Sequence, residues 1–430
     1  MNFRVFRLIC VEYRTFASRT FDLRTKLICL MKKYYDREIE QKILKEESQL
    51  VSTNQMSRLA VITGRRRVGK TELILRSMKS ENEVPFIYLF ASRVTSNALI
   101  GDWLQTISNT LGGHFVPRCE RLSQIIEYLL FLGKSQRINV AIDECQDINA
   151  IEPSFWSELP KIWDLNKKNS QVFLMMSGSI ASAMRNIFKE YSEPLYGRVD
   201  RFIQVRPFGI AVLEEILRDF NPRFNSDDLL ALYTLTGGIP WFVEDLMDRG
   251  ATTAKKMAEV VFQPGSKFIM DGEILLANEF RTEGTLNRTL LQAIASGLTK
   301  REELQNLAGD VSVSGSLSRL EKRYELITKE VALFAKSERK GRYYISDRYL
   351  SFWFAFVQSK EQWIAQNNYE ALKGEFLSRY ETFSGRVLES VFFDIFRESK
   401  KFETLGRWWD RKGQNEIDLI AIDKTSAYFF

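Results

Sequence analysis

An eight-residue segment that contains two glycines, a lysine and a threonine is the part of the sequence best suited to chemistry. It reads Gly64-Arg65-Arg66-Arg67-Val68-Gly69-Lys70-Thr71 and fits the pattern G-x-x-x-x-G-K-[ST]. The glycines let the backbone curl so that its N–H groups point at phosphate oxygens. Lys70 would reach the β- and γ-phosphates of a nucleotide, and the Thr71 hydroxyl would bind Mg²⁺. The segment follows an apolar stretch and opens a helix, whose positive N-terminus favours the same anion.

A pair of acids closes a second apolar stretch, Asn139-Val140-Ala141-Ile142-Asp143-Glu144. This is the Walker B pattern, in which Asp143 holds Mg²⁺ directly or through a water. Glu144 would orient and deprotonate a water that attacks the γ-phosphate. An acidic pair at the end of a strand is common alone, but this pair follows a phosphate-binding motif with one strand between them. A base after the Mg²⁺ acid indicates hydrolysis of ATP rather than a small-molecule kinase.

Three more features have both a functional and a structural interpretation. Ser177 or Ser179, at the end of a further apolar stretch, could sense the γ-phosphate, while Ser179 could equally cap a helix. Arg198 follows a tight turn and is either a surface residue or an arginine that reaches the γ-phosphate, in cis or from a neighbouring subunit. The three arginines inside the loop are expected to be solvated and to point away from the phosphates, or to contact a neighbouring subunit.

Five apolar segments predict the strands that position these residues, at 58–63, 85–91, 138–142, 171–176 and 201–205. Helical patterns separate them, and one at 34–50 has Asp36 as a plausible N-cap. Alternating strands and helices predict an α/β fold with a parallel five-stranded sheet that is covered on both faces. From residue 207 to about 280 the pattern is helical.

Six segments in this order resemble one known group of proteins. They are MKKYYDREIE, VITGRRRVGKTELI, VAIDECQD, MMSGS, EPLYGR and LTGGIPWFVE, and they span residues 31–250. They are similar to the prokaryotic archaeal-type P-loop ATPases, which are related to the AAA+ and STAND classes. The resemblance implies that Arg37 and Glu38 lie near the adenine pocket and that 237–240 opens a helix of a small lid domain. It also implies that Arg198 faces the nucleotide.

The chain from 283 to 357 shows the winged-helix pattern of three helices and a hairpin. The first helix is expected at 286–298 and the third at 312–324. The second is expected to begin after an N-cap at Thr299, with Glu302 and Glu303 in its first turn. The hairpin strands are expected at 326–331 and 342–345, with a basic tip at 336–342. The third helix offers Ser314, Ser316, Arg319, Lys322 and Arg323 for phosphate and groove contacts with DNA. Many winged helices bind proteins instead, and a charged hairpin tip is often only solvated.

The last fifty residues resemble the domain that commonly accompanies this ATPase family and that is similar to PD-(D/E)xK nucleases. Glu389 and Asp418 match the first two Mg²⁺-collecting acids of such a nuclease. The sequence contains no E-x-K after Asp418 and stops at Phe430, within the expected next strand. We therefore expect a truncated domain without nuclease activity, which leaves an apolar sheet edge.

Composition excludes several other classes of protein. The net charge of +6 does not by itself indicate a nucleic-acid partner, so a basic patch must be local. The 4 cysteines contain no CxxC pair, and His114 is the only histidine, which argues against a zinc site or a Ser-His-Asp triad. The cysteines indicate a reduced, cytoplasmic protein, and no apolar run approaches the ~20 residues of a membrane span. We expect residues 1–30 to be an N-terminal extension or a mis-set start.

These observations predict a P-loop NTPase of the AAA+-like type followed by further domains. The expected boundaries are 31–206 for the ATPase core, 207–282 for a helical lid, 283–357 for a winged helix and 358–430 for a partial nuclease-like α/β tail. We expect a Mg²⁺-dependent ATPase that acts as a switch or motor, with DNA, a protein partner or self-association open. A slow, nucleotide-gated DNA-binding regulator and an ATPase-coupled effector nuclease are the alternatives. The expected nucleotide site consists of Gly64, Arg65, Arg66, Arg67, Val68, Gly69, Lys70, Thr71, Glu72, Arg37, Asp143, Glu144, Ser179 and Arg198.

Overall fold

The computed structural model divides the chain into Met1–Asp36 and Arg37–Phe430. It describes residues 33–79, 84–113, 117–179, 181–188, 195, 197–280, 284–335, 341–410 and 414–430. The expected extension at 1–30, His114 and most of the expected basic hairpin tip, at 336–340, lie outside the described residues. The fold of the second unit determines where the candidate site lies.

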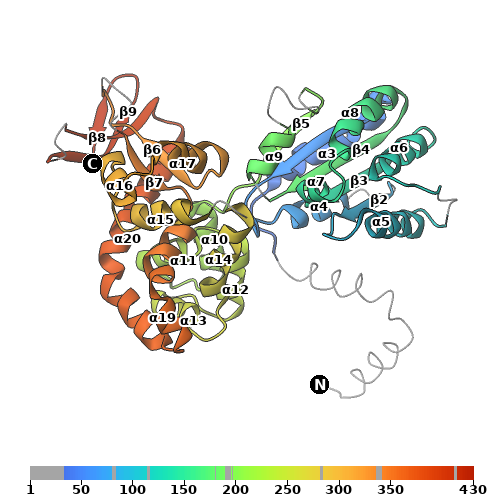
Figure 1. Cartoon of the computed structure of the whole chain (residues 1–430). Coiled ribbons are helices and arrows are strands. Elements are labelled where there is room, and N and C mark those ends of the chain that lie inside the picture. Colours follow the sequence, from blue (N-terminus) through green and yellow to red (C-terminus); the bar gives the residue numbers. More distant parts are fainter. Residues whose placement is uncertain are drawn as a thin grey trace, which may run out of the picture. The chain divides into compact units, whose positions relative to one another are not determined.

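A five-stranded parallel sheet forms the centre of the first half of this unit (Figure 1). Its spatial order is β2-β3-β4-β1-β5, so β4 separates β1 from β3. The parallel pairing places the carboxyl ends of all the strands at one edge, where ligands bind in sheets of this kind. The strands are β1 (Arg58–Thr63), β2 (Phe86–Phe90), β3 (Ile138–Asp143), β4 (Val172–Gly178) and β5 (Arg201–Gln204).

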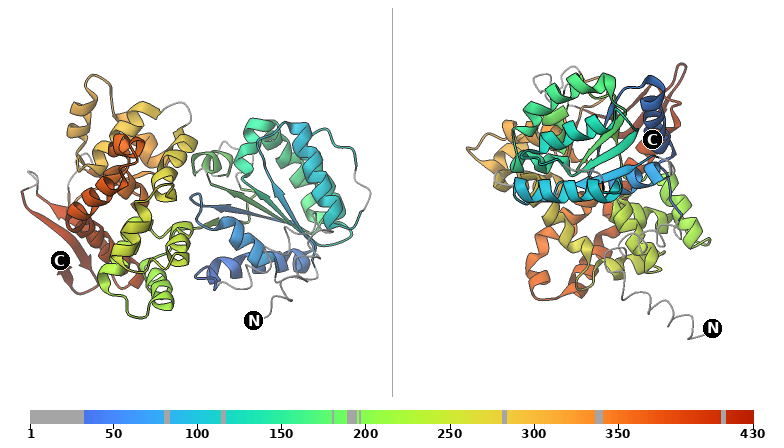
Figure 2. Two further views of the ribbon diagram at one scale, coloured as in Figure 1. Left: turned by 90° about the horizontal axis from the view of Figure 1, so that it is seen from below. Right: turned by 90° about the vertical axis from the view of Figure 1, so that its right-hand side faces the viewer.

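Alternate residues of the strands enter two different cores, as the two-residue period of a strand requires. Leu59 and Val61 of β1 pack in one apolar cluster, whereas Ala60 and Ile62 pack in another on the opposite face. Helices cover both faces of the sheet (Figure 2). These helices are α3 (Glu38–Asn54), α4 (Lys70–Lys79), α5 (Ser96–Thr110), α6 (Leu122–Leu132), α7 (Ile148–Ile151), α8 (Phe155–Asn166) and α9 (Ala181–Phe188), with short 3-10 turns at Cys145–Asp147 and Lys167–Asn169.

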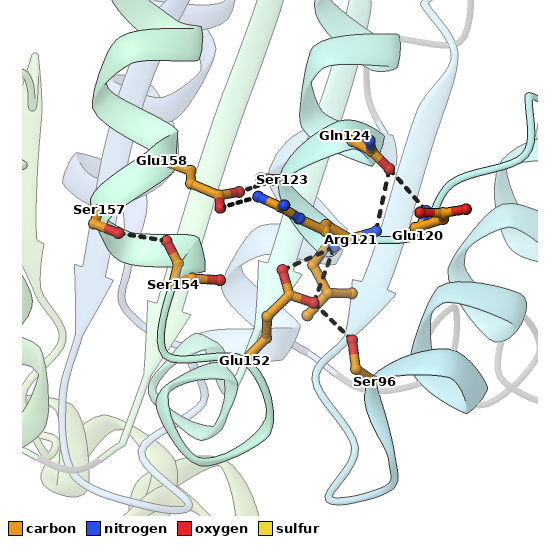
Figure 3. Close-up of polar contacts among 10 residues, drawn as sticks. Ser96, Glu120, Arg121, Ser123, Gln124, Glu152, Ser154, Ser157 and Glu158 are labelled. Carbon is orange, nitrogen blue, oxygen red and sulfur yellow. Dashed lines mark hydrogen bonds and ion pairs between the residues drawn. The ribbon is translucent and has the colours of Figure 1, made fainter.

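Two acids tie together the helix N-termini on one side of this sheet (Figure 3). Glu152 accepts the backbone N–H of Leu122 at 3.1 Å and the hydroxyl of Ser96 at 2.6 Å. Glu158 accepts hydrogen bonds from Arg121 and Ser123, both at 2.5 Å. Carboxylates are stabilising at helix N-termini because they complement the helix dipole and its unpaired N–H groups.

The second half of the unit is mainly helical and carries two small antiparallel sheets. Buried aromatic rings join its helices; Phe242, for example, stacks on Phe268 and Tyr349 with ring centroids 4.6 and 4.4 Å away. No helix in the described ranges has the length and apolar character of a membrane span. The helices are α10 (Ile210–Phe220), α11 (Ser226–Thr236), α12 (Pro240–Asp248), α13 (Ala254–Val261), α14 (Lys267–Phe280), α15 (Gly284–Ala295), α16 (Arg301–Ala308), α17 (Ser314–Ser318), α18 (Arg348–Phe356), α19 (Glu361–Ala365) and α20 (Tyr369–Ser399). A π-helical turn spans Arg319–Arg323, a 3-10 turn spans Gln358–Lys360, and the strands are β6 (Ile327–Glu330), β7 (Arg342–Ile345), β8 (Thr404–Trp409), β9 (Glu416–Ile422) and β10 (Ala427–Phe429).

Three predicted helix starts or lengths are wrong. Helix α3 begins at Glu38 rather than near residue 34, because Asp36 and Arg37 have φ values of 59° and 82° in the left-handed region. Helix α16 is capped by Lys300, whose N–H donates to Glu303, instead of by Thr299. The predicted helix at 312–324 is shorter, since α17 passes into the π-helical turn at Arg319.

The buried carboxylate of Glu47 is expected to make a large contribution to the stability of the sheet edge. It is 1% exposed and accepts hydrogen bonds from Arg58 of β1 and Arg201 of β5, both at 2.5 Å. We predict that Glu47→Ala lowers the free energy of unfolding by about 2 kcal/mol, measured by urea denaturation, because it leaves the Arg58 charge poorly paired. The exposed neighbour Glu46 is the control, and Glu46→Ala should change stability by less than about 0.5 kcal/mol. Equal effects of both substitutions would contradict this interpretation.

Candidate nucleotide-binding site

The loop between β1 and α4 has the backbone that a phosphate cradle needs. Gly64 has a φ of 154°, and a Cβ built there would lie 2.4 Å from the carbonyl oxygen of Val205. Gly69, directly before α4, has a φ of 94°. Arg67 also lies in the left-handed region, with a φ of 68°. The two glycines of the motif therefore have backbone conformations that are unfavourable for other residues, and the N-terminus of α4 faces the loop.

The ammonium of Lys70 lies within this loop. It donates to the carbonyl oxygens of Gly64 and Arg65 at 3.0 and 3.2 Å, and the side chain is 5% exposed. Burial lowers the pKa of Lys70, while the nearby Glu144 and Asp143 carboxylates oppose that effect. The lysine is therefore held at the loop by weak, neutral acceptors, which a phosphate can replace with charge-assisted bonds.

The carboxylate of Asp143 collects hydroxyl groups from three different elements. Oδ2 accepts Thr71 Oγ1 at 2.6 Å and the phenol of Tyr88 at 2.8 Å, and Oδ1 accepts the Ser177 hydroxyl. Burial and the Asp143 charge raise the pKa of Tyr88 well above its ordinary value, so the phenol stays a donor. The sequence motifs predicted the Thr71–Asp143 pair. Tyr88 was missed because an aromatic residue on a buried strand has no local signal of function.

These oxygen atoms fit a divalent cation. Magnesium is usually held by one or two protein oxygens together with phosphates and waters, and Thr71 and Asp143 present such a pair at 2.6 Å. Among the described residues no group of three or more His, Cys, Asp and Glu side chains could hold a metal ion.

The carboxylate of the second acid, Glu144, has different hydrogen-bond partners from the carboxylate of Asp143. Its φ of 53° lies in the left-handed region, and its Oε2 accepts Ser179 at 2.7 Å and Gln146 at 2.5 Å. The two serines at the end of β4 thus contact different acids, Ser177 the first and Ser179 the second. Gln146 was missed from the sequence, because its contact with Glu144 depends on the turn at the end of β3.

A cleft of about 1370 Å³ opens beside these groups. Gly64, Arg65, Arg66, Glu144 and Ser179 are among the residues that line it. This volume exceeds that of a typical ligand pocket, so the site is accessible to a ligand of nucleotide size.

Arg37 and Glu72 occupy different places around the loop. Arg37 is buried, and its guanidinium donates to the carbonyl oxygens of Arg206 at 2.5 Å and Val68 at 3.5 Å. It therefore braces the loop against the segment after β5. Glu72 accepts a hydrogen bond from Arg76, four residues further along α4, at 2.5 Å.

The structure does not bring Arg198 to the loop. Its guanidinium donates to Asp164 at 2.9 and 2.7 Å, and the nearby Asp200 N–H donates to the carbonyl of Leu59, at the start of β1. The phosphate loop begins about five residues further along β1, which corresponds to roughly 16 Å of strand. Arg198 therefore lies toward the opposite edge of the sheet, and no cis contact with a phosphate at the loop follows from this geometry.

Two of the three loop arginines are not solvated as the sequence predicted. Arg65 forms an ion pair with Asp347, and Arg67 forms one with Asp271. Both acids belong to the helical second half of the unit, more than 200 residues along the chain. The expectation of solvation fails because no local pattern reveals such distant partners.

A second cavity, of about 340 Å³, contains the two acids predicted for a nuclease-like site. Glu389 and Asp418 both line it, and Glu389 pairs with Arg407 at 3.0 Å. Burial raises the pKa of Glu389, to which the neighbouring Asp418 contributes while Arg407 opposes it. The two acids therefore line the same cavity, but Glu389 is already paired with an arginine.

A parallel sheet with a glycine-rich loop after β1 and an acid pair after β3 defines the class of P-loop ATPases. Residues 34–246 match the model of a family described as an ATPase domain predominantly from Archaea. This segment is therefore similar to the ATPase domains of that family, which confirms the predicted resemblance, and the chain is an ATP-hydrolysing enzyme. Residues 353–430 match a second family, described as archaeal and bacterial proteins of unknown function.

Two relatives extend this comparison. An uncharacterized protein of Methanocaldococcus jannaschii is 28% identical over 413 residues, which cover 91% of this chain and 84% of the relative. The solved structure of a Walker-type ATPase of Pyrococcus abyssi is similar with a TM-score of 0.54 and 21% identity, over 75% of this chain and 96% of that chain. The second comparison confirms the α/β fold.

The Tyr88 phenol is predicted to orient Asp143 for cation binding. We expect Tyr88→Phe to raise the Mg²⁺ concentration for half-maximal ATP hydrolysis about tenfold, because an outer hydrogen bond to the cation-binding carboxylate is lost. The maximal rate at saturating Mg²⁺ should change little. Tyr128→Phe on α6 is the matched control and should leave the Mg²⁺ titration unchanged. An unaltered titration for Tyr88→Phe would refute this role.

Proposed function

We propose that this ATPase is a Mg²⁺-dependent switch or motor whose nucleotide lies on the loop 64–71. The observation that carries the proposal is the 2.6 Å contact between Thr71 and Asp143, which joins the phosphate loop to the acid pair. Parallel strands end at one edge, so residues separated by more than seventy positions can serve one ligand. Loop amides and the N-terminus of α4 supply the positive field for the phosphates.

The chemical step would be in-line attack of water on the γ-phosphate. Lys70 would bridge the β- and γ-phosphates and stabilise the charge that develops on them. Thr71 and Asp143 would hold Mg²⁺, which neutralises phosphate charge when bound. Glu144 would orient the attacking water and accept its proton, with Ser179 and Gln146 fixing the orientation of the carboxylate.

The base assignment predicts a separation of binding from turnover. Glu144→Gln keeps the size of the side chain and one acceptor oxygen but removes the base, so ATP affinity should persist while the rate of hydrolysis falls at least about 100-fold. Lys70→Ala should instead lose ATP binding. Binding is measured with a fluorescent ATP analogue and turnover by phosphate release. A Glu144→Gln variant with unchanged turnover would refute the assignment.

A nucleotide-gated DNA-binding regulator is the second candidate. Its support is the segment that follows α15 and α16, where Arg319, Lys322 and Arg323 are all exposed next to the hairpin of β6 and β7. This order of three helices and a hairpin resembles a winged helix, and exposed basic side chains suit phosphate contacts. Ser316, which was expected to contact DNA, is buried and fits this role poorly.

The salt dependence of duplex DNA binding tests this candidate. Replacing Lys322 and Arg323 together with alanine should weaken duplex binding and lower the slope of log K against log salt by about two, one per phosphate contact. The exposed pair Lys255 and Lys256 on α13 is the matched control. The measurement is fluorescence anisotropy between low and moderate salt. Equal loss from both double variants would show only a nonspecific charge effect, which would count against the regulator.

A further inference from the structure

Arg67, in the middle of the phosphate loop, contacts side chains from two helices of the second half of the unit. It forms an ion pair with Asp271 of α14, which is 7% exposed, and its guanidinium carbon lies 3.4 Å from the ring centroid of Trp241 of α12. A guanidinium over an indole face gains electrostatic attraction from the ring in addition to packing. Lys267, also of α14, approaches the same ring at 4.0 Å.

Arg65 is held in a similar way by a third helix. It forms an ion pair with Asp347 and lies 5.2 Å from the ring centroid of Tyr349. Asp347 is also the N-cap of α18, where it accepts the backbone N–H of Leu350 at 2.9 Å. The hydrogen bond to its own helix therefore orients the Asp347 carboxylate toward one position, independently of the arginine.

The pairs on Arg65 and Arg67 lie in a region of low solvent exposure. Burial raises the pKa of Asp271, and Arg67, Arg65 and Arg66 all oppose that rise, so all three loop arginines act on this one carboxylate. Ion pairs that are shielded from solvent are screened less by salt than surface pairs and constrain geometry more strongly.

The backbone of the loop has a reason to need such support. Arg67 has a φ of 68°, a conformation that a non-glycine residue adopts at a cost and keeps only when its surroundings enforce it. The motif requires curled backbone at this place, because its N–H groups must converge on a phosphate. Arg67 is the one non-glycine residue of the loop 64–71 with positive φ, and it is also the one that touches both Asp271 and Trp241.

We propose that Asp271, Trp241 and Asp347 are positioning residues for the nucleotide site, which hold the phosphate loop through Arg67 and Arg65. The inference rests on the proposed nucleotide site at loop 64–71. It means that the ATPase core does not form its phosphate cradle alone, since helices α12, α14 and α18 complete it. By thermodynamic reciprocity, a nucleotide that prefers the held loop must also favour the held arrangement of these helices.

A purely structural role makes a different prediction from a positioning role. If the pairs only joined two parts of the fold, their loss would lower stability and leave the affinity of the folded protein for ATP unchanged. If they position the loop, their loss weakens ATP binding in protein that is still folded, because the loop must then be ordered at the expense of binding energy.

The test is a double-mutant cycle on ATP affinity in the full chain. Arg67→Ala and Asp271→Asn should each weaken binding of a fluorescent ATP analogue about tenfold, and the double variant should lose no more than Arg67→Ala alone, because that substitution already removes the contact with Asp271. Asp271→Glu, which keeps the charge, should restore most of the affinity. The same loss is expected for Asp347→Asn, which provides a second variant if Asp271→Asn does not fold.

Glu273 provides the matched control for these substitutions. It is an exposed residue of α14, two positions from Asp271, and it pairs with Arg288 at 2.7 Å. Glu273→Gln should leave ATP affinity within twofold of wild type. Wild-type affinity in folded Asp271→Asn and Asp347→Asn protein, or additive losses in the cycle, would overturn the proposal. Failure of the proposed nucleotide site itself would look different, because Lys70→Ala would then bind ATP as well as wild type does.

Discussion

The candidate site depends on where the carboxylate of Asp143 is held. This acid ends β3, and β4 separates its strand from β1, whose end continues into the phosphate loop. Hydroxyl groups from the loop side, from β2 and from β4 converge on the two oxygens of Asp143. A parallel sheet brings those strand ends to one edge, so the topology of the fold creates the candidate cation site.

Short-range patterns predicted much of this structure. The strand at 58–63 was predicted residue for residue, because a continuous apolar run before a glycine loop is characteristic of a buried parallel strand. The pairing of Thr71 with Asp143 followed from two motifs whose spacing fits a P-loop. In these cases the information lies within about ten residues of sequence, and the known geometry of parallel sheets supplies the rest.

The sequence could not predict contacts whose partners are distant and chemically ordinary. Tyr88 resembles any aromatic residue in a strand until β2 and β3 pair. Arg65 and Arg67 looked solvated because their acids, Asp347 and Asp271, lie beyond several helices in the chain. The predicted start of α3 was wrong because the two residues before the helix have left-handed backbone conformations, which side-chain propensity does not reveal.

The loop arginines show how a general ATPase core can become specific to its own chain. The motif fixes only the glycines, the lysine and the threonine, and leaves the intervening positions open to other uses. Here two of those positions carry side chains that reach acids of the second half of the unit. Partly buried ion pairs of this kind define a particular arrangement even where they add little net stability.

The most direct measurement of the central claim is a crystal structure of the full chain with Mg²⁺ and a non-hydrolysable ATP analogue. We expect a cation about 2.1 Å from Thr71 Oγ1, with Asp143 bound to it directly or through one water. We also expect the γ-phosphate beside Lys70. A nucleotide bound elsewhere, or one bound to the loop with its cation remote from Asp143, would show that the loop and Asp143 do not form one Mg·ATP site.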